Sequence, residues 1–143
     1  MSPQGERRLL QTAVAIVTLV PLSVASLSIL RGAGWLAESP VPRDLDSHFR
    51  YLSGIFLALG IAYASCIPRI EATTARFRLL GLMVIAGGLA RALSLVEAGP
   101  PSTGHLVGLG IELGIVPLMI AWQARVARRW HERGGPGGAI SPA

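Results

Sequence analysis

The sequence predicts an all-α fold, a four-helix transmembrane bundle with both termini in the cytoplasm (N-in/C-in). Three observations predict it. The chain has four apolar stretches, each close to the roughly 20 residues that cross a hydrocarbon core. Only 15% of its 143 residues are charged, against about 25% in an ordinary soluble domain. Its arginines cluster at the ends of the apolar stretches. These features argue against a soluble enzyme and favour a small integral membrane protein with one domain.

The apolar stretches define a transmembrane domain over residues 9–124. Its expected helices cover residues 9–30, 48–67, 79–98 and 105–124. The alternation of apolar and polar residues that is typical of a β-barrel is absent, so the spans are expected to be helices. The first stretch is long for a signal peptide and no clear cleavage site follows it, so we expect it to remain in the protein.

Prolines and charged residues mark the borders of these stretches. Pro68 stops the second stretch, and a Gly99-Pro100-Pro101 sequence ends the third. Residues 1–8 are expected to form a cytoplasmic N-terminus. Residues 125–143 are expected to form a basic, partly disordered cytoplasmic tail, because arginines there give way to glycine, proline and serine.

The orientation in the membrane is predicted from the arginines, because the chain contains no lysine. The arginines contribute to its net charge of +5. One side of the predicted bundle carries most of them: Arg7, Arg8, Arg69, Arg76, Arg78, Arg125, Arg128, Arg129 and Arg133. The other side carries Arg31 and Arg43. The positive-inside rule therefore places the termini in the cytoplasm and predicts a multi-pass protein of a bacterial inner (plasma) membrane. Arginines grouped in this way indicate that the protein's partner is a lipid bilayer, and no nucleic-acid partner is expected.

Two ionisable residues, Arg91 and Glu112, fall well inside predicted spans. Arg91 lies seven residues before the end of the third stretch at Ala98, and Glu112 lies seven residues after the start of the fourth at His105. With a rise of 1.5 Å per residue, both side chains lie about 10 Å below the outer boundary. An unpaired charge costs about 2.5–3.5 kcal/mol at a helix centre, so we expect the two side chains to pair.

Two roles remain open for this pair. It is either a structural clamp that fixes the register of two helices, or a site with chemistry in which Glu112 and Arg91 are the candidate catalytic residues. Five further polar residues of the outer half are candidates for substrate binding: His48, Arg50, Ser94, Glu97 and His105. The alternative for each is an interfacial side chain in contact with lipid headgroups or water.

The sequence offers no pattern for a cofactor. His48 and His105 lie at similar predicted depth, but no HxxxH, CxxC or ExxH spacing accompanies them, so no metal site is expected. No phosphate-binding or dinucleotide-binding motif is present either. Pro21 and Pro117 lie inside predicted helices and are expected to kink them.

Three segments carry a resemblance: HFRYLSGIFLALG (residues 48–60), GGLARALS (residues 87–94) and ELG (residues 112–114). They resemble a family of small bacterial four-pass membrane proteins known only as a domain of unknown function. The resemblance covers residues 45–123. It implies a four-helix membrane protein with polar positions that match Arg50, Arg91 and Glu112, and it implies no activity, substrate or cofactor.

Three hypotheses for function follow. The first is an accessory or lipid-associated membrane subunit in which the Arg91–Glu112 pair holds register. Whatever its function, the chain is expected to be able to form a homo-oligomer or part of a larger membrane complex. The second is an intramembrane enzyme, an isomerase, cyclase or epoxide-opening catalyst, that acts on a lipophilic substrate with Glu112 as acid/base. The third is a small proton-coupled transporter in which Glu112 exchanges the proton.

Overall fold

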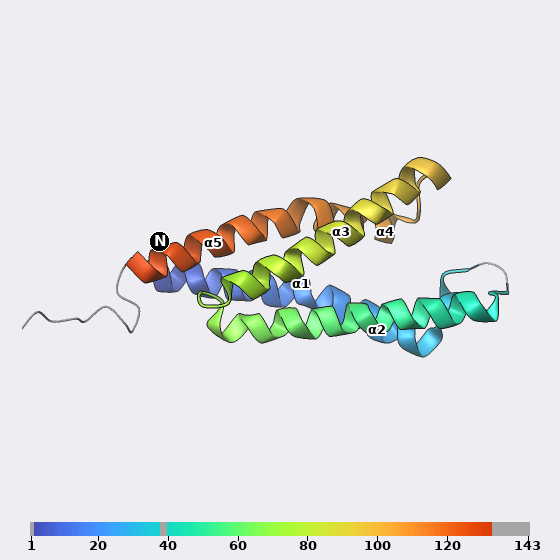
Figure 1. Cartoon of the computed structure of the whole chain (residues 1–143), viewed down its shortest axis with the longest axis horizontal. Coiled ribbons are helices and arrows are strands. Elements are labelled where there is room, and N and C mark those ends of the chain that lie inside the picture. The colour runs from blue at the N-terminus through green and yellow to red at the C-terminus, as the bar shows by residue number, and fades with distance from the viewer. Residues whose placement is uncertain (1, 38–39, 133–143) are drawn as a thin grey trace, which may run out of the picture. The chain divides into compact units, whose positions relative to one another are not determined.

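The computed structural model describes residues 2–37 and 40–132, and every regular element in these ranges is helical (Figure 1). In chain order the elements are α1 (Pro3–Arg31), the 3₁₀ turn η1 (Ala33–Trp35), α2 (Arg43–Cys66), the 3₁₀ turn η2 (Ile67–Arg69), α3 (Thr74–Ala98), α4 (Thr103–Gly110), the π-helical segment η3 (Ile111–Ile115) and α5 (Val116–Glu132). The predicted all-α fold class is confirmed. The end of the predicted tail, residues 133–143 with Arg133, lies outside the described residues.

Four helical segments are long and apolar enough to cross a membrane. They are Pro3–Arg31, Arg43–Arg69, Thr74–Ala98 and Thr103–Glu132, the last made of α4, η3 and α5 in succession. Between 11% and 22% of the residues in their most apolar windows are buried within the protein. Large apolar side chains such as Leu30 and Val96 are instead 78% and 82% exposed, as expected for a surface that faces lipid. The protein is thus a small membrane protein.

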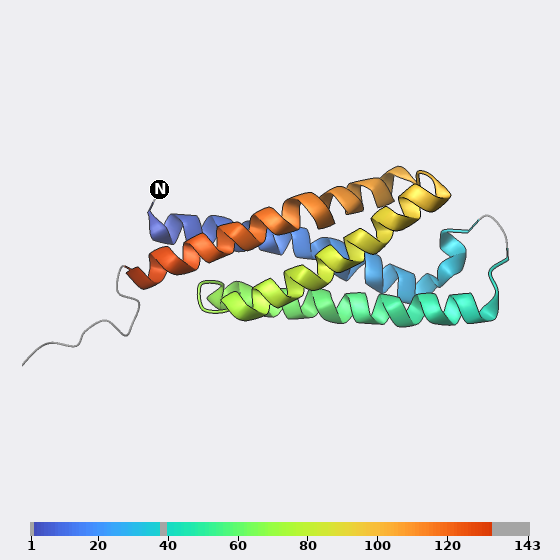
Figure 2. The same ribbon diagram turned by 45° about the horizontal axis from the view of Figure 1, so that its top comes forward.

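The chain forms two compact units, one of Thr12–Ile67 and one of Met1–Gln11 with Pro68–Ala143. In the first unit, α2 and the part of α1 from Thr12 onward run side by side (Figures 1 and 2). Gly60 lets the two helices approach closely, since a β-carbon at this position would lie 3.2 Å from Leu22 Cδ2 and 3.3 Å from Pro21 Cβ. The proline inside α1 therefore belongs to a helix contact.

Polar contacts close the end of this unit that contains the turn from α1 to α2. Gly32 adopts φ +69°, a conformation that favours glycine, and the following Ala33 donates its N–H to Asp46 Oδ1 at 2.7 Å. Arg50 donates to the second oxygen of Asp46 at 2.8 Å and also to the carbonyl oxygen of Ile29. Asp46 and Arg50 thus join the last turn of α1 to the first turns of α2.

The second unit is built on α3 and the segment α4-η3-α5, which follow each other through a turn at Gly99 (Figure 2). Phe77 of α3 and Ile70 of the preceding turn are almost fully buried, as is Leu10 from the first turns of α1. The N-terminal turns of α1 therefore belong to the core of this unit, although they come from the opposite end of the chain. Both residues of the Arg91–Glu112 pair lie in this second unit.

Candidate functional site

The side chains of Arg91 and Glu112 meet between α3 and η3. Arg91 Nη2 donates to Glu112 Oε1 at 3.0 Å, and the ion pair is partly buried, with the two side chains 34% and 12% exposed. The second carboxylate oxygen, Glu112 Oε2, is buried and accepts no hydrogen bond from the described part of the chain. The two oxygens of Glu112 thus have different roles, because one fixes the pair and the other has an unused acceptor position.

Glu112 lies in the π-helical segment, and Pro117 supplies the physical reason for this local structure. An α-helix would need an N–H at residue 117 to bond the carbonyl of Leu113, but proline has none and its ring clashes with that carbonyl. The backbone hydrogen bond here spans five residues where an α-helix spans four, because Val116 donates its N–H to Ile111 O. The kink expected at Pro117 takes the form of a π-helix, a structure that is frequent at functional sites.

Gly88 allows α3 to approach this segment. A β-carbon at Gly88 would lie 2.8 Å from Leu113 Cδ2 and 2.9 Å from Glu112 Cβ, closer than van der Waals contact permits. Gly88 lies three residues before Arg91 on the same face of α3. The small residue and the arginine together therefore place one turn of α3 against Glu112.

Arg91 keeps hydrogen-bonding capacity beyond the ion pair. A guanidinium has five N–H donors, of which the contact with Glu112 uses one. Arg91 also extends toward Gly108 of α4, where a β-carbon would lie 3.6 Å from Arg91 Nη1. The site therefore offers an unused carboxylate acceptor beside unused cationic donors.

The other candidate residues of this unit lie nearer the turn between α3 and α4. Ser94 and Glu97 are exposed on the last turns of α3. His105 Nδ1 and Ser102 Oγ lie 2.9 Å apart at the start of α4, which is a local contact at a helix N-terminus. None of these three candidate residues forms a hydrogen bond with Arg91 or Glu112 in the described part of the chain.

His48 and Arg50 belong to the unit of residues 12–67. The rings of His48 and Tyr51 lie at a tilt to each other, with 6.4 Å between their centroids. Arg50 is engaged by Asp46 and by the end of α1. The expectation that these two residues share the outer half of the bundle with Ser94, Glu97 and His105 stays a prediction. Across the described ranges, no group of three His, Cys, Asp or Glu side chains is arranged to hold a metal ion.

A family model described as a domain of unknown function, DUF4345, matches residues 9–123. The chain belongs to the DUF4345 family. This match includes Arg50, Arg91 and Glu112, the positions singled out by the resemblance. No curated protein matches the chain, and no solved structure does.

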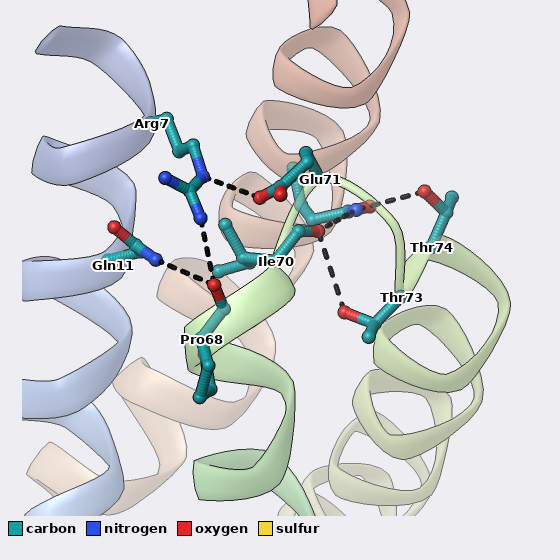
Figure 3. A network of polar contacts seen from close by, with 8 residues as sticks. Arg7, Gln11, Pro68, Ile70, Glu71, Thr73 and Thr74 are labelled. Carbon is teal, nitrogen blue, oxygen red and sulfur yellow. Dashed lines mark hydrogen bonds and ion pairs between the residues drawn. The ribbon is translucent and has the colours of Figure 1, made fainter. Parts of the chain in front are cut away.

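This DUF4345 protein has a second polar cluster, at the opposite end of α3 and α5, that sequence reasoning missed. Figure 3 shows its main contacts, around the turn that precedes α3. Arg7 donates to Glu71 Oε2 at 2.6 Å and to the carbonyl oxygen of Pro68 at 2.8 Å. Gln123 is 1% exposed and donates to Ile70 O at 2.7 Å and to Thr74 Oγ1 at 2.9 Å.

Glu6 extends this cluster along α5. Its carboxylate is 6% exposed and accepts from Arg129 at 2.8 Å, with Arg125 at 3.2 Å on the other oxygen. Arg125 and Arg129 are four residues apart, so both lie on the face of α5 that Glu6 meets. The only sequence signals were a glutamine inside an apolar stretch and this arginine spacing. We interpret the cluster as the structural tie between the two ends of the chain.

Proposed function

We propose that this DUF4345 protein is a lipid-associated accessory protein of the membrane, and that its Arg91–Glu112 site binds the hydroxyl group of a lipophilic molecule. The observation that carries this proposal is the buried Glu112 Oε2, which lacks a donor among the described residues. A buried acceptor without a donor is costly, and the cost is removed when a ligand supplies the donor. A hydroxyl group matches the site because it donates to Oε2 and accepts from a free N–H of Arg91.

The position of the pair in the chain supports a lipophilic ligand. Arg91 and Glu112 both lie inside helical segments that are apolar enough to cross a membrane. A ligand that reaches them from the side must pass through the hydrocarbon region, so its body must be apolar. Ion pairs at such depth are expensive, and intramembrane ionisable residues mark functional sites by default.

The arginine distribution supports the finer location. Together with the positive-inside rule it favours a bacterial inner membrane with both termini in the cytoplasm. The Arg91–Glu112 site then lies in the outer half of the bilayer.

Two matched probes test the proposed ligand class. The protein in phosphatidylcholine nanodiscs is titrated with 1-dodecanol and with its methyl ether, which lacks only the hydroxyl donor. We expect the alcohol to bind and the ether to bind at least about tenfold more weakly, because a hydrogen bond to a charged group contributes about 1.5–3 kcal/mol. Glu112→Gln keeps an acceptor for Arg91 and replaces the second acceptor by a donor, so it is expected to remove the preference. Equal binding of alcohol and ether to the native protein would contradict the proposal.

A second candidate function is an intramembrane enzyme, and the same free oxygen favours it. Glu112 would act as acid/base on a lipophilic substrate, while Arg91 would stabilise a developing oxyanion. The π-helix around Glu112 fits this interpretation as well. The two functions differ in turnover: an accessory protein returns its ligand with unchanged mass, whereas an enzyme returns a product, and Glu112→Gln would abolish the conversion while the fold is kept.

A further inference from the structure

An open cavity of about 440 Å³ lies between the first turns of α3 and the last turns of α5. Its lining combines basic, small and polar side chains: Thr74, Arg78, Ala124, Ala127, Arg128, His131 and Glu132. We call it the basic pocket. It is at the opposite end of α3 from Arg91, so it is independent of the function proposed above.

The basic pocket lies where the apolar stretches of α3 and α5 meet their arginine-rich ends. Arg78 directly precedes the apolar stretch of α3, and Ala124 is the last residue of the apolar stretch of α5. Leu79, the next residue after Arg78, is 61% exposed, so apolar side-chain surface begins directly after this arginine in the chain. A lipid whose chains lie against the helices would therefore bring its headgroup to this level.

The arginines of the pocket differ from their neighbours in their partners. Arg7 is paired with Glu71, and Arg125 and Arg129 are paired with Glu6. Arg78 and Arg128, by contrast, are exposed and form no ion pair with any residue from 2 to 37 or from 40 to 132. Two cations therefore face the pocket with their charge uncompensated, apart from the carboxylate of Glu132 in its lining.

The small side chains explain why a cavity exists between these cations. Ala124 and Ala127 lie three residues apart on α5 and leave space that larger side chains would fill. Arg128 follows directly, and His131 lies one turn further on, so basic groups surround this space. Planar guanidinium groups bind phosphate oxygens through paired hydrogen bonds, and the Thr74 hydroxyl adds a neutral donor.

We propose that the basic pocket binds the phosphodiester headgroup of an anionic phospholipid, with Arg78 and Arg128 as the principal contacts. Basic pockets between transmembrane helices on the cytoplasmic side are suited to such headgroups. Zwitterionic lipids fit less well, since a choline cation would meet the same arginines. Soluble phosphate shares the chemistry of the headgroup but has no apolar chains for the adjoining surface.

The test is a calorimetric titration of the full chain in a mild maltoside detergent. The probes are dihexanoylphosphatidylglycerol, dihexanoylphosphatidylcholine and inorganic phosphate. We expect phosphatidylglycerol to bind tightest. Arg78→Gln combined with Arg128→Gln should weaken its binding about 30-fold, as each basic residue near the membrane surface contributes about a fivefold change.

A matched control removes the same charge elsewhere. Arg31→Gln with Arg43→Gln changes two exposed arginines that flank the turn between α1 and α2 and do not line the pocket, so it should leave the affinity within about twofold. Glu132→Gln removes the acid of the pocket and should tighten binding about threefold to fivefold, a gain that a damaged fold could not produce.

Three results would overturn the proposal. The first is an equal loss of affinity in both double variants, which would show a general charge effect. The second is an unchanged affinity for phosphatidylglycerol in the Arg78/Arg128 variant with its melting temperature preserved. If that variant does not fold, an unchanged affinity in Glu132→Gln would overturn the proposal instead. The third is inorganic phosphate that binds as tightly as phosphatidylglycerol, which would assign the pocket to a soluble anion.

Discussion

Arg91 of α3 donates to one carboxylate oxygen of Glu112 across 3.0 Å and leaves the other oxygen buried without a donor from the described residues. This relationship joins the two roles that the sequence left open. The contact with Oε1 can hold the register between α3 and η3, while Oε2 is available to a ligand. Measurements of stability and of ligand binding therefore report on different oxygens of the same carboxylate.

If the contact between Arg91 and Glu112 Oε1 holds the register of α3 and η3, the two side chains are strongly coupled in stability. Arg91→Ala and Glu112→Ala should each lower the free energy of unfolding by about 1–3 kcal/mol, below the full range for a buried pair because Arg91 is a third exposed. The double variant should recover part of the sum, since it leaves no unpaired charge. Unfolding in a detergent series with increasing SDS measures all four proteins, and single variants with native stability would exclude a clamp.

Gly88 and Gly87 offer a test of the close approach between α3 and η3. Gly88→Ala should destabilise the protein by about 1–3 kcal/mol, because its β-carbon would meet Glu112 Cβ and Leu113. Gly87→Ala meets nothing within 4 Å and should be neutral or stabilising by up to about 1 kcal/mol through helix propensity. Melting temperatures of the two purified variants make the comparison. If both substitutions had the same effect, the packing described for Gly88 would be wrong.

Pro117 is expected to control the π-helix. Pro117→Ala restores an N–H that can bond Leu113 O, so the segment 111–115 should tighten into an α-helix. Glu112 would then rotate relative to Arg91. The coupling energy from the Arg91/Glu112 cycle should fall to less than half when measured in the Pro117→Ala background. Pro21→Ala, in the other unit, is the control and should leave that coupling unchanged.

Cysteine labelling tests the orientation in the membrane. In a Cys66→Ala background, Gly34→Cys places a thiol in the turn between α1 and α2, where a β-carbon meets nothing within 4 Å. Ala72→Cys places one in the exposed turn before α3. With both termini inside, a membrane-impermeant maleimide should label residue 34 in intact spheroplasts and residue 72 only after permeabilisation. The reverse pattern would place the termini outside.

The sequence was sufficient to predict the fold class for a simple physical reason. A helix that crosses a membrane must satisfy its own backbone and be apolar over about 20 residues, so each span leaves a local signal. The contact between Arg91 and Glu112 could be expected by counting positions along the same helices. Both inferences use only neighbouring residues and a fixed rise per residue.

Other features of the structure depend on contacts between residues far apart in the chain, which a local sequence pattern does not reveal. Pro117 predicts a disturbed helix, but its missing N–H does not by itself distinguish a π-helix from a simple kink. The ties from Glu6 to Arg125 and Arg129 join residues that are about 120 positions apart in the chain. Gln123 was visible as a polar residue in an apolar stretch, yet its partner is a backbone carbonyl, which every residue has.

The most direct test of the central claim is native mass spectrometry of the protein released from a mild detergent, with Glu112→Gln as the paired sample. We expect the native protein to retain a hydroxyl-bearing lipophilic molecule and Glu112→Gln, with its fold intact by gel filtration, to lose it. A native protein that carries no hydroxyl-bearing lipophilic molecule, or equal retention of it by both proteins, would contradict the assignment of Glu112 Oε2 as a ligand-binding atom.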